Sequence, residues 1–256
     1  MHVFFLVLAR DGRFVKEKIK ELESLNVPFL VVCGEQVGLP NVVFREPRGK
    51  YDAINFGASL IPKDVGIVAL NDVDTKVFNI QNALKYFDSP GVGLVFARVS
   101  VTSGPQKSFY SLLDPVRCRL RIAASGELMF VRRQVLMSCV PMKPCKAEDS
   151  YILFKTMELH NKAIFCEESF VETERTKTAE MEEDYKRRTV CGIYQALANT
   201  RPSIPIKLFY VLLPFMSPLL LILGKKGFFW TKGILSGLSD YIRGDRSGSW
   251  IATGSQ

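Results

Sequence analysis

The sequence lacks the patterns that a zinc site or a disulfide framework requires. Its six cysteines form no C-x-x-C pair, and both histidines, His2 and His160, are isolated. We therefore expect neither a structural zinc site nor a disulfide-stapled fold, and a reducing cytosol is the simplest setting. Low-complexity runs are missing too. Of the 256 residues, 47% are hydrophobic and 23% are charged, which excludes a disordered chain.

The N-terminus has no basic residues ahead of its apolar run, and that run, residues 3–9, is short. It predicts a first buried strand and not a secretory signal. Short apolar runs then alternate with amphipathic stretches, which is typical of a mostly parallel sheet covered by helices. The predicted strands are 3–8, 29–33, 42–44, 65–70 and 92–97, and the predicted helices are 13–25, 51–60 and 80–87.

After residue 100 this rhythm breaks, but further elements are predicted. We expect a short strand within 125–133 and helices at 147–159 and 182–199. The predicted fold class is therefore α/β, with a nucleotide-binding mixed sheet flanked by helices over 1–203. In such sheets, ligands bind beyond the carboxyl ends of the strands.

The C-terminal part joins apolar and basic residues. Residues 201–256 hold seven basic and two acidic residues, so +5 of the net charge of +8 lies there. The apolar run 208–223 would span about 24 Å as a helix, less than the hydrocarbon core of about 30 Å, and it contains Pro214 and Pro218. We predict a membrane-seated hairpin or re-entrant element over 204–243, with a flexible tail over 244–256. The alternative is a buried pair of core helices.

This charge distribution favours lipid headgroups over nucleic acid as the partner, because the basic residues lie beside the most apolar segment. We expect the protein at the cytoplasmic face of the cell membrane.

The sharpest local feature is a pair of aspartates after a predicted buried strand. Asp72 and Asp74, in "NDVDT", are separated by one residue. Two such carboxylates can hold a hard divalent cation, Mg²⁺ or Mn²⁺, that bridges a diphosphate. Because Asp-x-Asp is also common in turns, the pair alone does not decide the function.

Further polar residues flank this pair. Lys50 and Asn55 lie in "GKYDAINFGASL", where the basic side chain could face phosphate. Glu148 and Asp149 begin the helix 147–159, and by themselves they are better explained as charges that suit a helix N-terminus.

Taken together, these motifs resemble the inverting glycosyltransferases of family 2, which have the GT-A fold. The resemblance runs from the first strand to about Ala198, and the membrane-associated members that transfer sugars to dolichyl or polyprenyl phosphate are similar. It rests on "GKYDAINFGASL", "NDVDT", "ASGELMFVRR", "AEDSYI" and "YKRRTVCGIYQAL", in the family's order.

The resemblance implies roles for individual residues. It implies that Asp72 lies near the nucleotide ribose or the sugar, and that Asp74 binds the metal of the donor diphosphate. Lys50 and Asn55 would belong to the nucleotide-sugar site. Asp149 matches the general base that deprotonates the acceptor hydroxyl, a role that needs a carboxylate within hydrogen-bond reach. Glu148 beside it is a candidate acceptor contact.

The sequence departs from the family pattern in two places. Where processive members have Q-x-x-R-W, Arg188 is kept as a candidate diphosphate contact but Thr189 replaces the tryptophan. This argues against long-chain polymer synthesis, and a solvated helix face is the alternative for 186–188. The family's acidic nucleobase contacts are also missing, and Asp11 and Glu35 are the candidates to replace them.

Arg117 and Arg121 belong to an alternating arginine series that could bind an acceptor lipid phosphate, although plain surface arginines are the alternative. The predicted function is metal-dependent transfer of a hexosyl group from a nucleotide sugar to a membrane-held acceptor, either a polyprenyl phosphate or a lipid-linked saccharide. Two other functions remain open. They are a sugar-phosphate nucleotidyltransferase, disfavoured by the single glycine after the first strand, and a non-catalytic membrane-surface module.

Overall fold

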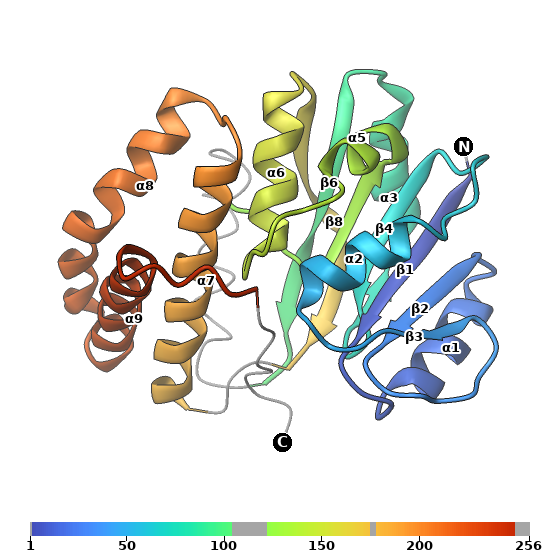
Figure 1. The fold of residues 1–256 in the computed structure, drawn as a ribbon, viewed down its shortest axis with the longest axis horizontal. Coiled ribbons are helices and arrows are strands. Elements are labelled where there is room, and N and C mark those ends of the chain that lie inside the picture. Colours follow the sequence, from blue (N-terminus) through green and yellow to red (C-terminus); the bar gives the residue numbers. More distant parts are fainter. Residues whose placement is uncertain (1, 104–121, 175–177, 249–256) are drawn as a thin grey trace.

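The computed structural model describes residues 2–103, 122–174 and 178–248, which form an eight-stranded mixed sheet and the helices around it (Figure 1). The strand order is β3-β2-β1-β4-β7-β6-β8-β5. The strands are β1 Val3–Ala9, β2 Phe29–Cys33, β3 Val42–Phe44, β4 Ile67–Asp72, β5 Lys76–Phe78, β6 Val92–Val101, β7 Leu128–Arg132 and β8 Lys162–Thr173.

Most strand pairs of the sheet are parallel, and the antiparallel pairs all involve β5 or β7. Strands β1, β2, β3 and β4 pair in parallel, as do β6 and β8. β7 pairs antiparallel with both β4 and β6, and β5 pairs antiparallel with β8. The prediction of a mixed α/β sheet is confirmed, and β7 explains the broken rhythm after residue 100.

Helices cover both faces of the sheet, so β1 is buried on both sides. Phe4 and Leu6 face a core shared with α2, α5 and α6, whereas Phe5 and Val7 face a core shared with α1 and α3. This alternation follows from the two-residue period of a strand. These helices are α1 Val15–Ser24, α2 Lys50–Ala58, α3 Ile80–Leu84, α5 Arg133–Cys139 and α6 Glu148–Glu158, and a 3₁₀ turn, η1 Lys85–Asp88, follows α3.

The C-terminal helices form a separate layer beside the sheet, on the left of Figure 1. They are α7 Ala179–Asn199, α8 Ile204–Met216, the 3₁₀ helix η2 Ser217–Leu223 and α9 Lys225–Ile242. α9 lies against α7 through two glycines. A Cβ added at Gly233 would come within 2.7 Å of the carbonyl oxygen of Glu183, and one at Gly237 within 2.5 Å of that of Arg187. Only glycine allows this close approach.

α8 packs on the body of the protein along one stripe and is exposed elsewhere. Ile206, Tyr210 and Pro214 are buried, and the Tyr210 hydroxyl donates to the carbonyl of Ile122 at 2.6 Å. By length and composition alone, 204–223 could cross a membrane, and 22% of its apolar window is buried. The exposed apolar side chains of α8, η2 and α9, here called the apolar face, include Ile204, Leu208, Val211, Phe215, Leu219, Ile222 and Phe228.

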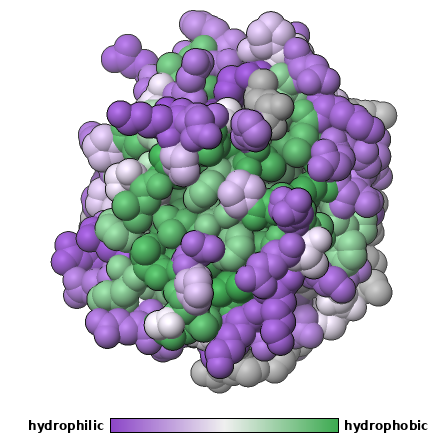
Figure 2. Space-filling model, turned by 90° about the vertical axis from the view of Figure 1, so that its right-hand side faces the viewer, coloured by the Kyte–Doolittle hydropathy of each residue, from purple (hydrophilic) through white to green (hydrophobic). Residues whose placement is uncertain are grey.

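Apolar exposure is not confined to that layer. Figure 2 turns the right-hand side of Figure 1 toward the viewer, and hydrophobic side chains gather in the middle of that face within a hydrophilic rim. The strongest exposure nevertheless belongs to the apolar face. Ile222 is 86% exposed and Phe215 79%, compared with 48% for Phe44 on β3.

Candidate active site

A lysine bridges two carboxylates where β4 ends and α6 begins. Lys50, at the start of α2, lies 2.7 Å from Asp72 Oδ1 and 3.1 Å from Glu148 Oε1. The three side chains are 14%, 19% and 9% exposed, so solvent screens the charges little. The structure thus brings together three side chains that the sequence predicted for one site, from positions up to 98 residues apart (148 − 50).

Burial and charge perturb this group strongly. Burial raises the pKa of Asp72 to about 7, even though the Lys50 ammonium opposes the shift. Burial by itself lowers the pKa of Lys50, but the charges of Asp72 and Glu148 outweigh it, so this pKa lies above its ordinary value. Perturbed groups of this kind are typical of functional sites, although structural ion pairs share the property.

Asp149 lies beside the bridge, half-buried at the N-terminus of α6. Its Oδ1 accepts from the backbone N–H of Ser150 at 2.6 Å. Burial and the neighbouring charge of Glu148 raise the pKa of Asp149 to about 7. Gly126 lies against it, since an added Cβ there would be 3.4 Å from Asp149 Oδ2. A carboxylate with this pKa can accept a proton near neutral pH, as a general base must.

Asp74 lies in the turn after β4, two residues beyond Asp72, and its side chain is exposed. Among the described residues it makes no hydrogen bond or ion pair. Asp72 Oδ1 has no hydrogen bond of good geometry either, although Lys50 lies close to it. No group of three or more His, Cys, Asp or Glu side chains within 2–103, 122–174 and 178–248 could hold a metal. A cation held by only two carboxylates needs further oxygen ligands. The pair Asp72 and Asp74 therefore suits Mg²⁺ or Mn²⁺ that binds together with a diphosphate, whose oxygens complete the coordination.

The two candidates for nucleobase contacts lie together at the same edge of the sheet. Asp11 follows β1 and pairs with Arg13 at 2.9 Å, a hydrogen bond that lowers the pKa of Asp11. Glu35 follows β2, and its Oε2 accepts from the backbone N–H of Gly12 at 3.0 Å. Both are near the carboxyl ends of parallel strands, where such sheets bind ligands. Their contact with a base stays a prediction.

Asn55 has a structural task. Its Nδ2 donates to the carbonyl of Met142 at 3.0 Å, and its Oδ1 accepts from the Met142 N–H at 2.7 Å. These bonds tie α2 to the loop before α6, which carries Glu148 and Asp149. The contact of Asn55 with the donor stays a prediction.

The basic residues of α7 are used mainly in packing against α9. Lys186 lies 3.7 Å from the centre of the Trp230 ring, and Arg187 pairs with Asp240 at 2.6 Å. Lys186 therefore packs on a ring, whereas Arg187, whose side chain is 48% exposed, still lies on a solvated face of the helix. Arg188 stacks over the Tyr185 ring at 5.7 Å, and its predicted diphosphate contact stays a prediction. Arg117 and Arg121, the candidate acceptor contacts, lie outside the described residues.

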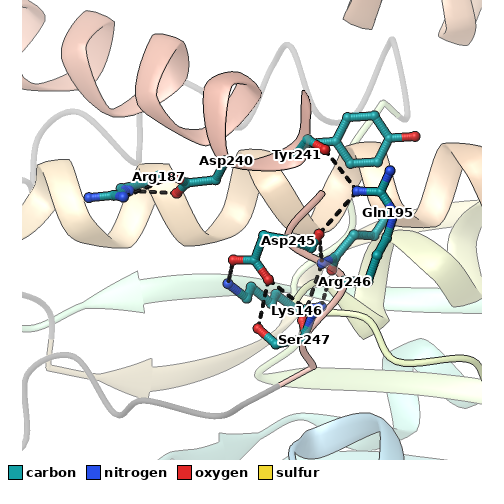
Figure 3. A network of polar contacts seen from close by, with 8 residues as sticks. All are labelled: Lys146, Arg187, Gln195, Asp240, Tyr241, Asp245, Arg246 and Ser247. Carbon is teal, nitrogen blue, oxygen red and sulfur yellow. Dashed lines mark hydrogen bonds and ion pairs between the residues drawn. The ribbon is translucent and has the colours of Figure 1, made fainter. Parts of the chain in front are cut away.

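Residues 244–248, which belong to the expected tail, make specific contacts, and Figure 3 shows those of Asp245, Arg246 and Ser247. Asp245 forms an ion pair with Lys146 at 2.5 Å, and Gln195 donates to the carbonyls of Asp245 and Ser247 at 3.1 and 3.2 Å. Gly248 then lies against Tyr51 and the backbone of Gly49. We call residues 244–248 the strap, because they join the end of α9 to the start of α2 beside Lys50.

Sequence reasoning missed Lys146, Tyr210 and Lys18 as residues that support this site. The tertiary contacts of Lys146 and Tyr210 leave no mark in the sequence. Lys18 does leave one, since it lies between Val15 and Leu22 on the apolar face of the helix predicted at 13–25. A charged residue at such a position signals a buried polar partner.

Comparisons with known proteins identify the fold. Neither the protein-family models nor the curated proteins give a match. Among solved structures, the mannosyltransferase PcManGT from Pyrobaculum calidifontis, in complex with GDP-Man and Mn²⁺, is 16% identical with a TM-score of 0.71, covering 94% of this chain and 87% of that one. This chain has the GT-A fold.

Two other structures agree. TarS 1-349 of S. aureus is 12% identical with a TM-score of 0.57, covering 96% of this chain and 92% of that one. Glucosyl-3-phosphoglycerate synthase of M. tuberculosis is 16% identical with a TM-score of 0.50, covering 77% and 80%. The GT-A prediction is confirmed. Membership of family 2 stays a prediction, because likeness at this level of identity shows the fold alone.

Proposed function

We propose that the protein is a metal-dependent, inverting glycosyltransferase that moves a hexosyl group from a nucleotide sugar to an acceptor held at a membrane. The observation that carries the proposal is the Lys50 bridge between Asp72 and Glu148, with Asp149 beside it, at the ligand-binding edge of a GT-A sheet. Mn²⁺ and GDP-Man in the complex of a protein with a TM-score of 0.71 support a metal and a nucleotide-sugar donor.

Each residue has a task in this reaction. Asp74 and Asp72 would hold Mg²⁺ or Mn²⁺, which, when bound, neutralises the leaving diphosphate. Lys50 keeps Asp72 in place and adds positive charge beside it. Asp149 takes the proton of an acceptor hydroxyl as this oxygen attacks the anomeric carbon opposite the leaving group. If the acceptor is a lipid phosphate, already ionised, Asp149 orients it instead.

The apolar face supports a membrane-held acceptor, either a polyprenyl phosphate or a lipid-linked saccharide. Monomeric soluble proteins rarely expose a large contiguous apolar area, and α8, η2 and α9 expose many apolar side chains. Charge contributes less than composition indicated, because Lys225 pairs with Glu180 and Lys232 with Glu183. We propose a location at the cytoplasmic face of the cell membrane, held mainly by apolar burial.

A screen of nucleotide sugars tests the catalytic proposal. With Mn²⁺, the right donor should raise the melting temperature, since a ligand present at 100 times its Kd stabilises the native state by about 2.7 kcal/mol. Asp74→Ala should lose the metal-dependent part of this shift, whereas Asp149→Asn should keep the shift and lose transfer. Release of nucleoside diphosphate supports a transferase, and release of pyrophosphate from a sugar phosphate and a nucleoside triphosphate would support a nucleotidyltransferase instead. If no donor binds or turns over, the non-catalytic module is favoured.

Vesicle binding tests the membrane proposal. The double substitution Phe215→Glu and Ile222→Glu should weaken sedimentation with liposomes at least 100-fold, because burying each side chain contributes about 1.5–3 kcal/mol. Phe44→Glu, an exposed phenylalanine on β3 away from the apolar face, is the matched control. Wild-type protein that stays in the supernatant with liposomes would refute the membrane proposal and leave the catalytic one standing.

A further inference from the structure

α1 contains a lysine where its neighbours on the same face are apolar. Lys18 shares the buried face of α1 with Val15 and Leu22 and is 2% exposed. Burial lowers the pKa of Lys18, and the carboxylate of Glu21 works against this shift. A lysine is almost never fully buried unless it is paired, so its partners show what it stabilises.

Apart from Glu21 of α1, these partners belong to the segment 71–77, which runs from the end of β4 into β5. Lys18 Nζ donates to Asn71 Oδ1 at 3.0 Å and to the carbonyl of Thr75, and it pairs with Glu21 at 2.8 Å. Glu21 Oε1 in turn accepts from the backbone N–H of Val77 at 2.6 Å. The side chains of α1 thus contact this segment at three points, residues 71, 75 and 77, and Asp72 and Asp74 lie between the first two.

The segment is also bonded internally. Asn71 Nδ2 donates to Thr75 Oγ1 at 2.8 Å, and this hydroxyl donates to the carbonyl of Asp72 at 2.9 Å. Asn71 is fully buried and Thr75 nearly so. Asp74, in contrast, is exposed and makes no hydrogen bond or ion pair with the described residues. The position of the Asp74 carboxylate therefore depends on how the residues around it are held.

We propose that Lys18, together with Glu21, is a positioning residue that fixes the Asp72–Asp74 turn for binding a divalent cation with a diphosphate. The inference rests on the proposed function for its ligand and on the contacts of α1 for its mechanism. Lys18 does not touch the ligand. It acts through Asn71 and the Thr75 carbonyl, and a metal site needs its ligands held to within about 0.5 Å.

The test compares Lys18→Met with two variants on the same helix. Lys20→Met removes an exposed lysine, and Leu22→Ala removes buried packing from the same helix face but none of the hydrogen bonds to residues 71–77. Amide hydrogen exchange of the full-length protein measures the turn, and the electron paramagnetic resonance of free Mn²⁺, recorded with ADP, GDP, CDP or UDP present, measures metal binding. Glu21→Gln keeps an oxygen for Val77 but removes the ion pair, so it serves if Lys18→Met does not fold.

We expect the amides of Thr75 and Val77 to exchange at least 10-fold faster in Lys18→Met than in Leu22→Ala, and the Kd for Mn²⁺ to rise at least 10-fold. Glu21→Gln should change both at least 3-fold, and Lys20→Met neither. Unchanged exchange at the turn, or faster exchange with unchanged Mn²⁺ affinity, overturns the inference. A wild type that binds no Mn²⁺ refutes the metal in the proposed function, whereas the exchange comparison still decides whether Lys18 holds the turn.

Discussion

Replacing Lys50 by methionine removes the one cation that bridges Asp72 and Glu148 among the described contacts of the site. With an effective dielectric constant of about 20, charges 2.7 and 3.1 Å apart attract each other by about 6 and 5 kcal/mol. Most of this is offset by the cost of burying the three charges. Removing one partner of a buried pair typically costs about 3–5 kcal/mol. The substitution also removes the cost of burying the lysine charge, so we expect Lys50→Met to lower the free energy of unfolding by about 3 kcal/mol.

The loss should depend on pH with a definite sign. Lys50 stabilises the native state only while its carboxylates are ionised, and the pKa of Asp72 is raised to about 7. The stabilisation by this pair therefore grows as the pH rises through 7 and declines as the pH falls through this value. In Lys50→Met, the loss should be larger at pH 8 than at pH 5.

Urea unfolding at both pH values, followed by far-UV circular dichroism, measures this difference. Lys63→Met, which removes an exposed lysine, is the control and should stay within about 0.5 kcal/mol of the wild type. Equal unfolding free energies for Lys50→Met and Lys63→Met would refute the bridge. A loss that grows on acidification would refute the assignment of charges.

Two further predictions concern neighbouring residues. Burial and the charges of Glu148 and Glu127 raise the pKa of Asp149 to about 7, although Lys50 opposes the shift, so the initial rate of sugar transfer to a hydroxyl acceptor should rise with pH from 6 to 8. Asp149→Asn should lower the rate about 10²–10⁴-fold and flatten the profile; a variant with the wild-type profile would exclude Asp149 as the base. Asn55→Ala should destabilise the protein by about 2 kcal/mol in urea unfolding, because it leaves the N–H and carbonyl of the buried Met142 unpaired. An unchanged midpoint would show that other groups replace both bonds.

The sequence predicted local elements better than their arrangement. The strands at 29–33 and 42–44 match to the residue, because their apolar runs are bounded by polar or turn residues. β8 was missed, although it is the longest described strand, since its pattern is interrupted where its pairing with β6 shifts register. The insertion of β7 between β4 and β6 depends on pairing across more than 30 residues, which periodicity does not encode.

For the candidate site, too, the sequence predicted individual residues better than the contacts between them. Asp72, Lys50, Glu148 and Asp149 were found because each belongs to a short motif, and the fold brings them together. The bonds that orient them were not predicted, since the partners of Asn55 and Lys50 lie far away along the chain. Lys18 was missed as well, although its place on an apolar helix face is visible in the sequence itself.

The strap limits how the helical layer can move. Its five residues, 244–248, cover at most about 17 Å when fully extended, and they run from the end of α9 to the backbone of Gly49. The layer that exposes the apolar face is therefore attached to the body of the protein at a point next to Lys50. A large rotation of α9 would have to separate Gly248 from Tyr51 or break the Lys146–Asp245 pair, so a partner that binds and displaces the helices would also displace the start of α2 beside Lys50.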